Sequence, residues 1–141
     1  MKIAEIEAQI VKEFESFDDW MDRYNHLIEM GNDLPRIDEQ YRNDQHLISG
    51  CQSRVWLHAS NDDGIITFTA DSDAVITKGI VNLLIRVLSG QTADEILNTK
   101  LAFVDTIGLK EHLSPTRSNG LTSMIKQMKL YALAYKTKEN N

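Results

Sequence analysis

Hydrophobic residues recur at helical spacing at both ends of the chain, and between them the spacing changes to every second residue. Isoleucines and phenylalanines three or four positions apart predict an amphipathic helix over residues 3–17. A second amphipathic helix opens at Trp20. Residues 16–19 have the pattern of a capping box at its start, and Gly31-Asn32 followed by Pro35 marks its end.

Residues 53–70 predict a β-hairpin. Apolar and polar side chains alternate from Ser53 and again after a turn at residues 61–64, which indicates two strands with one buried face. The side chains predicted to face inward are Val55, Leu57, Ile66 and Phe68. A short apolar segment at residues 47–49 is the candidate third strand. Residues 36–46 are polar and without period, and we interpret them as a surface connection.

The segment 74–88 is apolar except for a stripe of Lys78, Asn82 and Arg86 at a spacing of four. This pattern predicts a helix that is buried on most sides and forms the spine of the core. The preceding residues 71–73 offer three candidate N-caps for it.

Further helices complete the chain. Residues 92–95 form a capping box that opens a short helix, and residues 103–107 predict another, which ends at Gly108. The turn-forming residues 114–120 precede a long C-terminal amphipathic helix. The order of helices, meander and helices predicts an α+β fold with a small three-stranded antiparallel sheet and helices packed on one face, in a single domain over residues 1–141.

Length and composition narrow the class of protein. A chain of 141 residues with 42% hydrophobic and 26% charged residues is typical of one globular domain. One cysteine permits no internal disulfide, which favours a reducing, cytoplasmic compartment. Residues 1–5 turn acidic at once, so we expect no secretory signal. The apolar segment 74–88 is too short and too often interrupted to span a membrane.

The negative charge is concentrated in the first part of the chain. Residues 1–50 carry five basic and twelve acidic side chains, a net charge of −7, whereas residues 51–141 carry ten basic and nine acidic ones, a net charge of +1. Proteins that bind nucleic acid present a basic footprint, so no nucleic acid is expected as a partner. The acidic part fits either a solvated surface or a docking surface for a basic protein.

Cys51 is the strongest candidate for chemistry. The four histidines are scattered without metal-ligand spacing, so no metal or cofactor site is predicted. A lone cysteine is most often a small buried hydrophobic residue. Here Gly50 precedes it and the polar Gln52-Ser53 pair follows, which places the thiol in a turn at the end of a strand. A thiolate there would be stabilised if Arg54 or Arg117 lay close by.

Two segments of the chain stand out as motifs. They are Ser49-Gly50-Cys51-Gln52-Ser53-Arg54-Val55-Trp56 and, before the final helix, Leu113-Ser114-Pro115-Thr116-Arg117-Ser118-Asn119-Gly120-Leu121. The first resembles the signature around the acceptor cysteine of the SufE family of sulfur-acceptor proteins, and the second resembles another signature of the same family. The resemblance continues in the hairpin at Gly64-Ile65-Ile66 and around the start of the central helix, at Asp71-Ser72-Asp73-Ala74 and Lys78-Gly79.

The resemblance implies a SufE/IscU-like single domain that shuttles sulfur. A PLP-dependent cysteine desulfurase of the SufS or CsdA type would pass persulfide sulfur to Cys51, and an iron–sulfur scaffold of the SufBCD type would receive it. The protein would stimulate the desulfurase without being a stand-alone enzyme, would need no cofactor of its own, and would be a monomer or homodimer. Cluster assembly on this chain is not expected, because IscU-type scaffolds use several cysteines.

The resemblance also implies roles for the neighbours of the thiol. Gly50 would allow backbone conformations that a side chain hinders, and Gln52 and Ser53 would orient the loop. Arg117 matches the arginine of the second signature and would stabilise the thiolate or contact the desulfurase. Asp73 would serve the partner surface or cap the central helix.

We expect the Cys51 loop to be tucked in at rest and to swing out on the partner, because an exposed persulfide is lost to reductants and oxidants. Two other functions stay open. The chain would be a protein-binding adaptor if Cys51 is incidental. It would be an independent enzyme if Cys51 pairs with His46, His58 or His112.

Overall fold

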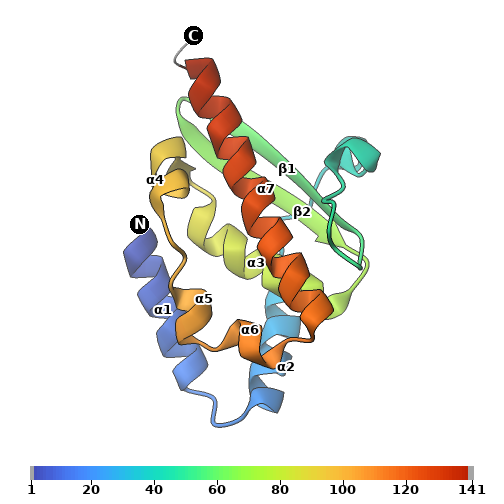
Figure 1. Cartoon of the computed structure of the whole chain (residues 1–141), viewed down its shortest axis with the longest axis vertical. Helices are drawn as coiled ribbons and strands as arrows, with labels where there is room; N and C mark the ends of the chain where they lie inside the picture. The colour runs from blue at the N-terminus through green and yellow to red at the C-terminus, as the bar shows by residue number, and fades with distance from the viewer. Residues whose placement is uncertain (1, 140–141) are drawn as a thin grey trace.

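The computed structural model describes residues 2–139, with helices in both terminal parts of the chain and a β-hairpin between them (Figure 1). The elements are α1 (Ile3–Glu15), α2 (Trp20–Asn32), the 3-10 turns η1 (Glu39–Tyr41) and η2 (Asp44–His46), β1 (Val55–Asp62), β2 (Ile65–Ser72), α3 (Val75–Leu88), β3 (Gln91–Thr92), α4 (Ala93–Asn98), α5 (Phe103–Thr106), α6 (Leu109–His112) and α7 (Pro115–Glu139). The predicted α+β fold with a three-stranded antiparallel sheet is confirmed.

Strands β1 and β2 form the predicted hairpin. They pair antiparallel along their whole length, and the turn consists of Asp63 and Gly64, whose backbones are both left-handed (φ 53° and 89°). Two left-handed residues give a turn whose twist matches that of a hairpin. All four side chains predicted to face inward are at most 1% exposed, namely Val55, Leu57, Ile66 and Phe68.

The third strand is β3 and not the segment 47–49. β3 pairs with β2 through Gln91 and Thr92, which gives the strand order β1-β2-β3. Segment 47–49 makes only an isolated bridge at Leu47, because the left-handed backbone of Gly50 (φ +90°) leads the chain away from β1. The prediction failed because β3 is two residues long, too short for an alternation to be visible.

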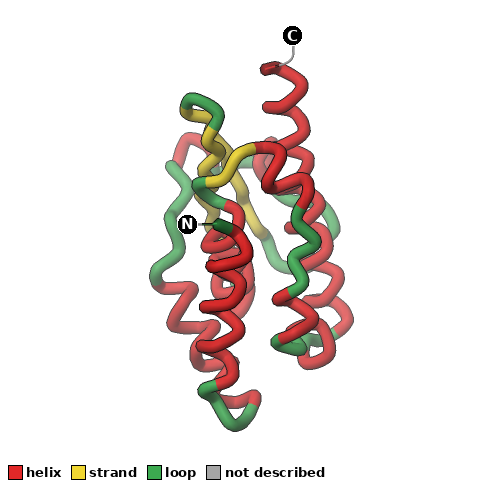
Figure 2. The backbone as a smooth tube through the Cα atoms, turned by 90° about the vertical axis from the view of Figure 1, so that its left-hand side faces the viewer, coloured by secondary structure: helices red, strands yellow, loops and turns green. Residues whose placement is uncertain are grey.

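Helix α3 is the centre of the core. It packs against α1, α2, β2 and α7, and the helices lie on one face of the sheet (Figures 1 and 2). Ten of its 14 residues are buried, as predicted for a spine helix. The connection at residues 36–46 covers part of the hairpin: Tyr41 stacks on His58, and the guanidinium of Arg42 lies over the ring of Trp56.

Helix α7 runs along the hairpin and covers the outer edge of β1 (Figure 1). The hydroxyl of Tyr131 donates to the carbonyl of Leu57 at 3.1 Å. The hydroxyl of Tyr135 donates to the carbonyl of Ala59 at 2.8 Å. Because β1 stands at the end of the strand order, these carbonyls would otherwise face solvent.

Helix α2 begins differently from the prediction. Asp19 is its N-cap, and the Asp19 carboxylate accepts a hydrogen bond from a backbone N–H of the first turn at 2.9 Å. Ser16 ends α1 instead, because its hydroxyl donates back to a carbonyl of that helix. The capping box predicted at residues 16–19 was therefore wrong, whereas the one formed by Thr92 and Glu95 at the start of α4 is confirmed.

The start of α3 also differs from the prediction. Its N-cap is Ala74, so the candidates at residues 71–73 are not N-caps. The hydroxyl of Ser72 accepts a hydrogen bond from the N–H of Ala74. The carboxylate of Asp73 instead accepts one from the N–H of Arg54 at 3.1 Å, which fastens the beginning of β1 to the end of β2.

Helix α7 begins at Pro115, so residues 114–120 are not a separate turn. Proline is favoured in the first helical position because its missing N–H would have no partner there. The hydroxyl of Ser114 accepts a hydrogen bond from the N–H of Arg117 at 3.3 Å, which is the geometry of an N-cap. The serine-proline pair is therefore a helix-start signal, and it places Arg117 and Gly120 in the first turns of α7.

Helices α2 and α3 touch through their backbones at Gly79. A β-carbon built on Gly79 would lie 2.0 Å from the carbonyl oxygen of Leu27. No side chain fits into that space without moving one helix from the other. The close crossing of the two helices therefore depends on glycine at this position.

We expect Gly79→Ala to lower the free energy of unfolding by about 1–3 kcal/mol, the usual cost of overpacking. Helix propensity alone would give the opposite sign, since alanine is favoured over glycine by about 1 kcal/mol. Chemical denaturation measures the change. Val75→Ala, at an exposed position of the same helix, serves as the control and should have little effect. Unchanged stability of Gly79→Ala would contradict the backbone contact.

Glu13 and Arg86 link α1 to α3 by a two-pronged ion pair. The Nη1 and Nη2 atoms of Arg86 lie 3.0 and 2.7 Å from the two carboxylate oxygens of Glu13. His26 Nε2 lies 3.1 Å from the same carboxylate. These contacts, above all the hydrogen bonds from Arg86, hold the pKa of Glu13 below its ordinary value of 4.5 in spite of partial burial.

Glu13→Gln should lower the stability near pH 7 by no more than about 1 kcal/mol, because the pair is partly exposed. The pKa of Glu13 is lower in the folded than in the unfolded state, so its contribution is present above the unfolded pKa and is lost as pH falls through the folded one. Urea denaturation at a series of pH values should show the native protein and the variant converging below pH 4.5. Glu15→Gln on the same helix is the control, and a difference independent of pH would argue against the ion pair.

Candidate functional site

The loop between η2 and β1 carries Cys51 and rests on α7. Before the cysteine it is anchored by the N–H of Ile48, which donates to the carbonyl of Val55 at 2.8 Å. A β-carbon on Gly50 would lie 2.4 Å from the Oγ of Ser123 in α7, and the backbone of Gly50 is left-handed. Only glycine meets both conditions without strain, so Gly50 lets the loop sit directly on the helix.

The thiol of Cys51 is half-buried against α7. Its Sγ lies 3.6 Å from the carbonyl oxygen of Gly120 and packs against the edge of the core. A β-carbon on Gly120 would lie 3.7 Å from the sulfur, which is an ordinary van der Waals contact, so the thiol lies directly against the backbone of α7 at this position. The thiol is thus held between the loop backbone and the first turns of the last helix.

Burial raises the pKa of the Cys51 thiol above its ordinary value of 9.0. The thiol is therefore protonated near pH 7, and the thiolate is the reactive form. Neither Arg54 nor Arg117 lowers the pKa of the thiol in this conformation, so the activation expected from a nearby arginine is absent at rest.

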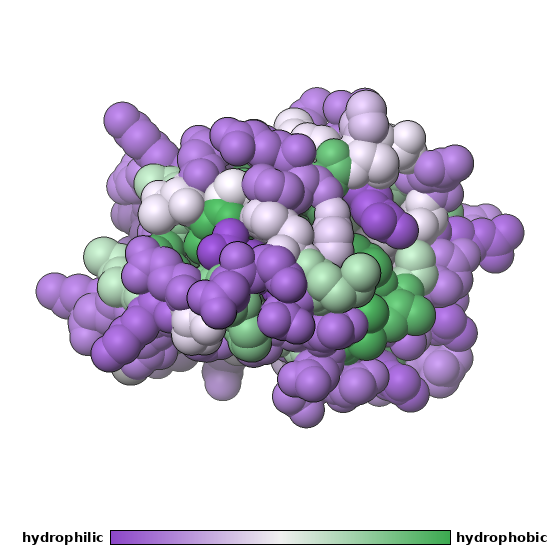
Figure 3. All heavy atoms as spheres, turned by 90° about the horizontal axis from the view of Figure 1, so that it is seen from below, coloured by the Kyte–Doolittle hydropathy of each residue, from purple (hydrophilic) through white to green (hydrophobic). Residues whose placement is uncertain are grey.

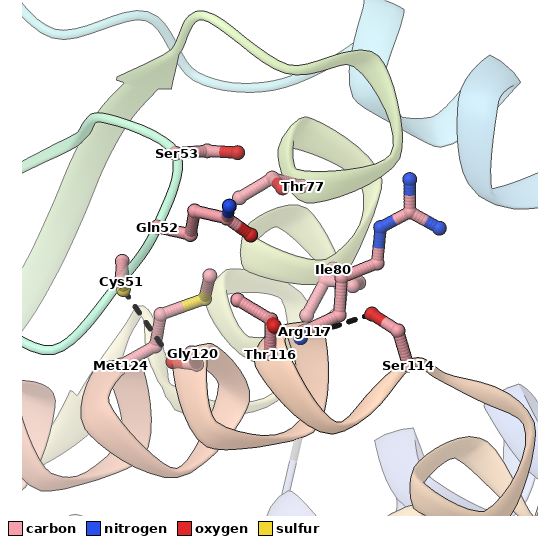
Figure 4. Close-up of a pocket in the computed structure, with 10 residues that line it drawn as sticks. All are labelled: Cys51, Gln52, Ser53, Thr77, Ile80, Ser114, Thr116, Arg117, Gly120 and Met124. Atoms are coloured by element: carbon pink, nitrogen blue, oxygen red, sulfur yellow. Dashed lines mark hydrogen bonds between the residues drawn. The ribbon is translucent and has the colours of Figure 1, made fainter.

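A cavity of about 320 Å³ opens beside the thiol, between the loop, α3 and the start of α7 (Figure 4). It is lined by Cys51, Gln52, Ser53, Thr77, Ile80, Ser114, Thr116, Arg117, Gly120 and Met124. Figure 4 shows Cys51 and Arg117 on opposite sides of the cavity, with Gln52 and Thr116 between them. The thiol thus faces a polar space large enough for a small molecule.

Three of the four residues expected to support the loop line this cavity. Gln52 and Ser53 line it from the loop and Arg117 from α7. Gly50 lies outside the lining and shapes the backbone of the loop instead. Asp73 is exposed and does not line the cavity, since its carboxylate binds the backbone at the beginning of β1.

Three lining residues lie in segments whose sequence indicates only a core helix. They are Thr77 and Ile80 on α3 and Met124 on α7. Thr77 is 7% exposed, although it is polar. A single hydroxyl in the first turn of an apolar helix was the one available signal, because a buried polar group needs a partner or a function.

No histidine lines the thiol cavity in the described part of the chain. His46 and His58 gather around Tyr41, and the rings of Tyr41 and His58 stack with 3.7 Å between their centroids. His112 stacks on Trp20 at 3.9 Å. Within residues 2–139, no group of three His, Cys, Asp or Glu side chains is arranged to hold a metal ion.

Fold and site together define a small α+β domain that presents a half-buried loop thiol to a polar cavity. The sequence model of the SufE family, described as an Fe–S metabolism associated domain, matches residues 8–132. The chain belongs to the SufE family, which confirms the resemblance inferred from the two motifs.

Curated relatives support this assignment. The chain is similar to an uncharacterised SufE-like protein of Rhizobium meliloti (strain 1021), with 43% identity over 128 residues that span 86% of this chain and 90% of that protein. A SufE-like protein of Rhizobium etli is 42% identical over 126 residues, or 86% and 85% of the two chains. SufE-like protein 1, chloroplastic/mitochondrial, of Arabidopsis thaliana is 38% identical over 131 residues, which span 92% of this chain but 35% of that longer protein.

A solved structure shares the fold. The solution structure of a hypothetical protein from Thermus thermophilus matches with a TM-score of 0.78 over 94% of this chain and 96% of that one. The sequence identity is 21%, so this match concerns the fold alone.

The surface seen from below is mainly hydrophilic, with hydrophobic areas between the charged side chains (Figure 3). The most exposed large hydrophobic residues are single side chains at helix starts, Met21 of α2 at 68% and Val75 of α3 at 56%. Within residues 2–139, no helix has both the length and the apolar character needed to cross a membrane.

Gly50→Ala should loosen the Cys51 loop from α7, because a side chain strains the left-handed backbone at this position and the added methyl group must also displace the hydroxyl of Ser123. The pKa of the thiol should then fall toward 9.0 as its burial is lost. Alkylation of the thiol below that pH should accelerate with the thiolate fraction, by about tenfold for each unit of pKa. The rate of iodoacetamide labelling, followed by mass spectrometry across a pH series, measures this.

Gly90→Ala is the matched control for this substitution. Gly90 is also left-handed (φ +83°), but no atom lies within 4 Å of its β-carbon position. It imposes the same kind of backbone strain without touching the loop, so labelling of Cys51 should stay at the native rate. Equal labelling rates for the native protein and Gly50→Ala would show that the glycine does not seat the loop.

Proposed function

We propose that this protein accepts sulfur on Cys51 from a cysteine desulfurase of the SufS or CsdA type and passes it on for iron–sulfur cluster assembly. The observation that carries the proposal is the lone loop thiol, seated on α7 beside a cavity, in a chain of the SufE family. The desulfurase supplies the PLP chemistry, and this chain contributes the acceptor thiol.

Sulfur transfer needs one thiolate with a clear line of approach. The Cys51 thiolate attacks the outer sulfur of the persulfide on the desulfurase, and a bond forms between Cys51 Sγ and that sulfur. The bond between the two sulfurs of the desulfurase breaks, and its electron pair leaves with the desulfurase cysteine as a thiolate. The outer sulfur keeps its oxidation state, so the step requires no oxidant or reductant.

The resting position of the thiol prevents sulfur transfer until the partner binds. Burial keeps the thiol protonated, and the loop backbone and Gly120 restrict access to Sγ. When the loop swings out on the partner, burial is lost and the pKa of the thiol falls, so the thiolate forms where the donor persulfide lies. After loading, return of the loop shields the persulfide from solvent.

The proposal includes the compartment, the oligomeric state and the partner proteins. Residues 1–141 work as a single domain in the cytoplasm, as a monomer or homodimer. Asp73 is exposed near the base of the Cys51 loop and belongs to the surface that meets the desulfurase. The sulfur leaves Cys51 for a scaffold of the SufBCD type. Removal of the persulfide from the desulfurase stimulates that enzyme, and this chain catalyses no reaction alone.

An independent cysteine-dependent enzyme fits the site less well. Such enzymes activate the thiol with an adjacent histidine. Neither His46, His58 nor His112 lines the cavity in the described part of the chain, and the pKa of the thiol is raised. An adaptor with an incidental cysteine does not account for a loop whose backbone is shaped to hold the thiol on α7.

Incubation with a cysteine desulfurase, PLP and cysteine tests the proposal. The intact mass of the native chain should increase by one sulfur atom, and Cys51→Ser should show no gain. Desulfurase turnover should rise several-fold with the native chain and return to its basal rate with Cys51→Ser. The control is Ser60→Ala, an exposed hydroxyl on β1, which should load like the native chain.

Two results would decide against sulfur transfer. Stimulation that persists with Cys51→Ser would favour the adaptor. Turnover of a substrate by the native chain in the absence of any desulfurase would favour the independent enzyme.

A further inference from the structure

Several polar side chains around the thiol cavity have no hydrogen-bond partner within residues 2–139, whereas the hydroxyl of Ser114 accepts one from the N–H of Arg117. Thr77 is 7% exposed, and its hydroxyl makes no hydrogen bond in this part of the chain. Over the same residues, the side chains of Gln52, Ser53 and Thr116 form no hydrogen bond, and the guanidinium of Arg117 forms neither a hydrogen bond nor an ion pair. Buried polar groups are nearly always satisfied, so the unpaired hydroxyl of the buried Thr77 at the cavity indicates a place for a ligand. Gln52, Thr116 and Arg117 are exposed, and their side chains are available to the same ligand.

The charge of the lining residues indicates that the ligand of this cavity is an anion. Arg117 is the only charged side chain among the ten lining residues, and none of the ten carries a carboxylate. A guanidinium offers a planar pair of N–H donors that matches a carboxylate. The hydroxyls and the amide of the lining add donors and acceptors for the polar groups of a small molecule. Ile80 and Met124 supply the apolar part of the wall.

We propose that this cavity binds a small thiol that bears a carboxylate, such as free cysteine, and that this thiol takes the sulfur from the Cys51 persulfide. The inference rests on the proposed function and adds a low-molecular-weight acceptor to it. Arg117 and Cys51 lie on opposite sides of the cavity (Figure 4), so a carboxylate held by Arg117 leaves the thiol end of the ligand facing Cys51. A volume of about 320 Å³ accommodates a molecule of this size.

The transfer balances without a further reactant. The thiolate of the ligand attacks the outer sulfur of the Cys51 persulfide and forms a new sulfur–sulfur bond with it. The bond between Cys51 Sγ and the outer sulfur breaks, and the electron pair remains on Sγ as a thiolate, which takes a proton from water as it returns to the buried position. The products are the free Cys51 thiol and a small-molecule persulfide.

Unloading of chemically loaded protein tests the inference. Cys51 is loaded with inorganic polysulfide, desalted, and checked by intact mass for one added sulfur atom. Cysteine and mercaptopropionate, which carry a carboxylate, are compared with mercaptoethanol and cysteamine, which do not, at equal thiolate concentration. The carboxylate thiols should unload the native chain with saturation and about tenfold faster at low concentration, the size of effect expected of one charge-assisted hydrogen-bonded pair.

Variants of the lining distinguish binding from general reactivity. Arg117→Gln should abolish the saturation, and the unloading rates with carboxylate thiols and with carboxylate-free thiols should then have a ratio of about one. Thr77→Val should lower this ratio in part. Lys110→Gln removes an exposed positive charge that does not line the cavity, and it should behave like the native chain. L-Serine, in which a hydroxyl replaces the thiol, should compete with cysteine on the native chain and not on Arg117→Gln.

Several results would overturn the inference. One is unloading that never saturates and proceeds equally with all four thiols. Another is Arg117→Gln that slows loading by the desulfurase but leaves the thiol preference intact, since Arg117 would then serve the protein partner. Failure of the desulfurase to load Cys51 would refute the proposed function instead, because the chemically loaded chain reports on the cavity independently.

Discussion

The contact between the Cys51 loop and helix α7 is the constraint on which the site depends. Gly50, with its left-handed backbone, lets the loop reach Ser123, and the sulfur of Cys51 lies against the backbone of Gly120. A thiol on a surface loop is thereby held in a partly buried, protonated state. The position of α7 in turn rests on α3, whose buried faces join the sheet to the N-terminal helices. The packing of α7 therefore affects both the stability of the fold and the reactivity of the Cys51 thiol.

Much of the fold was predictable because periodicity reports burial directly. The inward face of the hairpin and the buried helix α3 follow from spacings of two and four. Apart from the third strand, where β3 is too short for a pattern to be visible, the errors described above concern polar residues with several competing partners. Ser16 and Asp73 both have the chemistry of an N-cap, yet Ser16 bonds back into α1 and Asp73 binds the N–H of Arg54. Such choices depend on where the next element lies, which no local pattern contains.

The sequence predicted the site residues that lie within the two motifs, but not those that folding brings to the site from other segments. The motif around Cys51 and the segment with Arg117 identified the thiol and one side of the cavity. Thr77 was missed because it belongs to a third segment, which folding brings to the same space. The direction of the pKa shift was missed for the same reason: the shift is caused by burial, and Cys51 contacts α7 at Gly120, which lies 69 positions away in the chain.

The tyrosines of α7 also limit how copies of this chain can associate. On the outer edge of β1, Tyr131 and Tyr135 bind two alternate carbonyls, and the N–H of Ile48 binds the carbonyl of Val55. A strand from a second molecule would need these same acceptors to extend the sheet. At the opposite end, β3 offers a length of two residues. A homodimer of this protein must therefore form through helices or loops, and edge-to-edge growth of the sheet is blocked within the monomer.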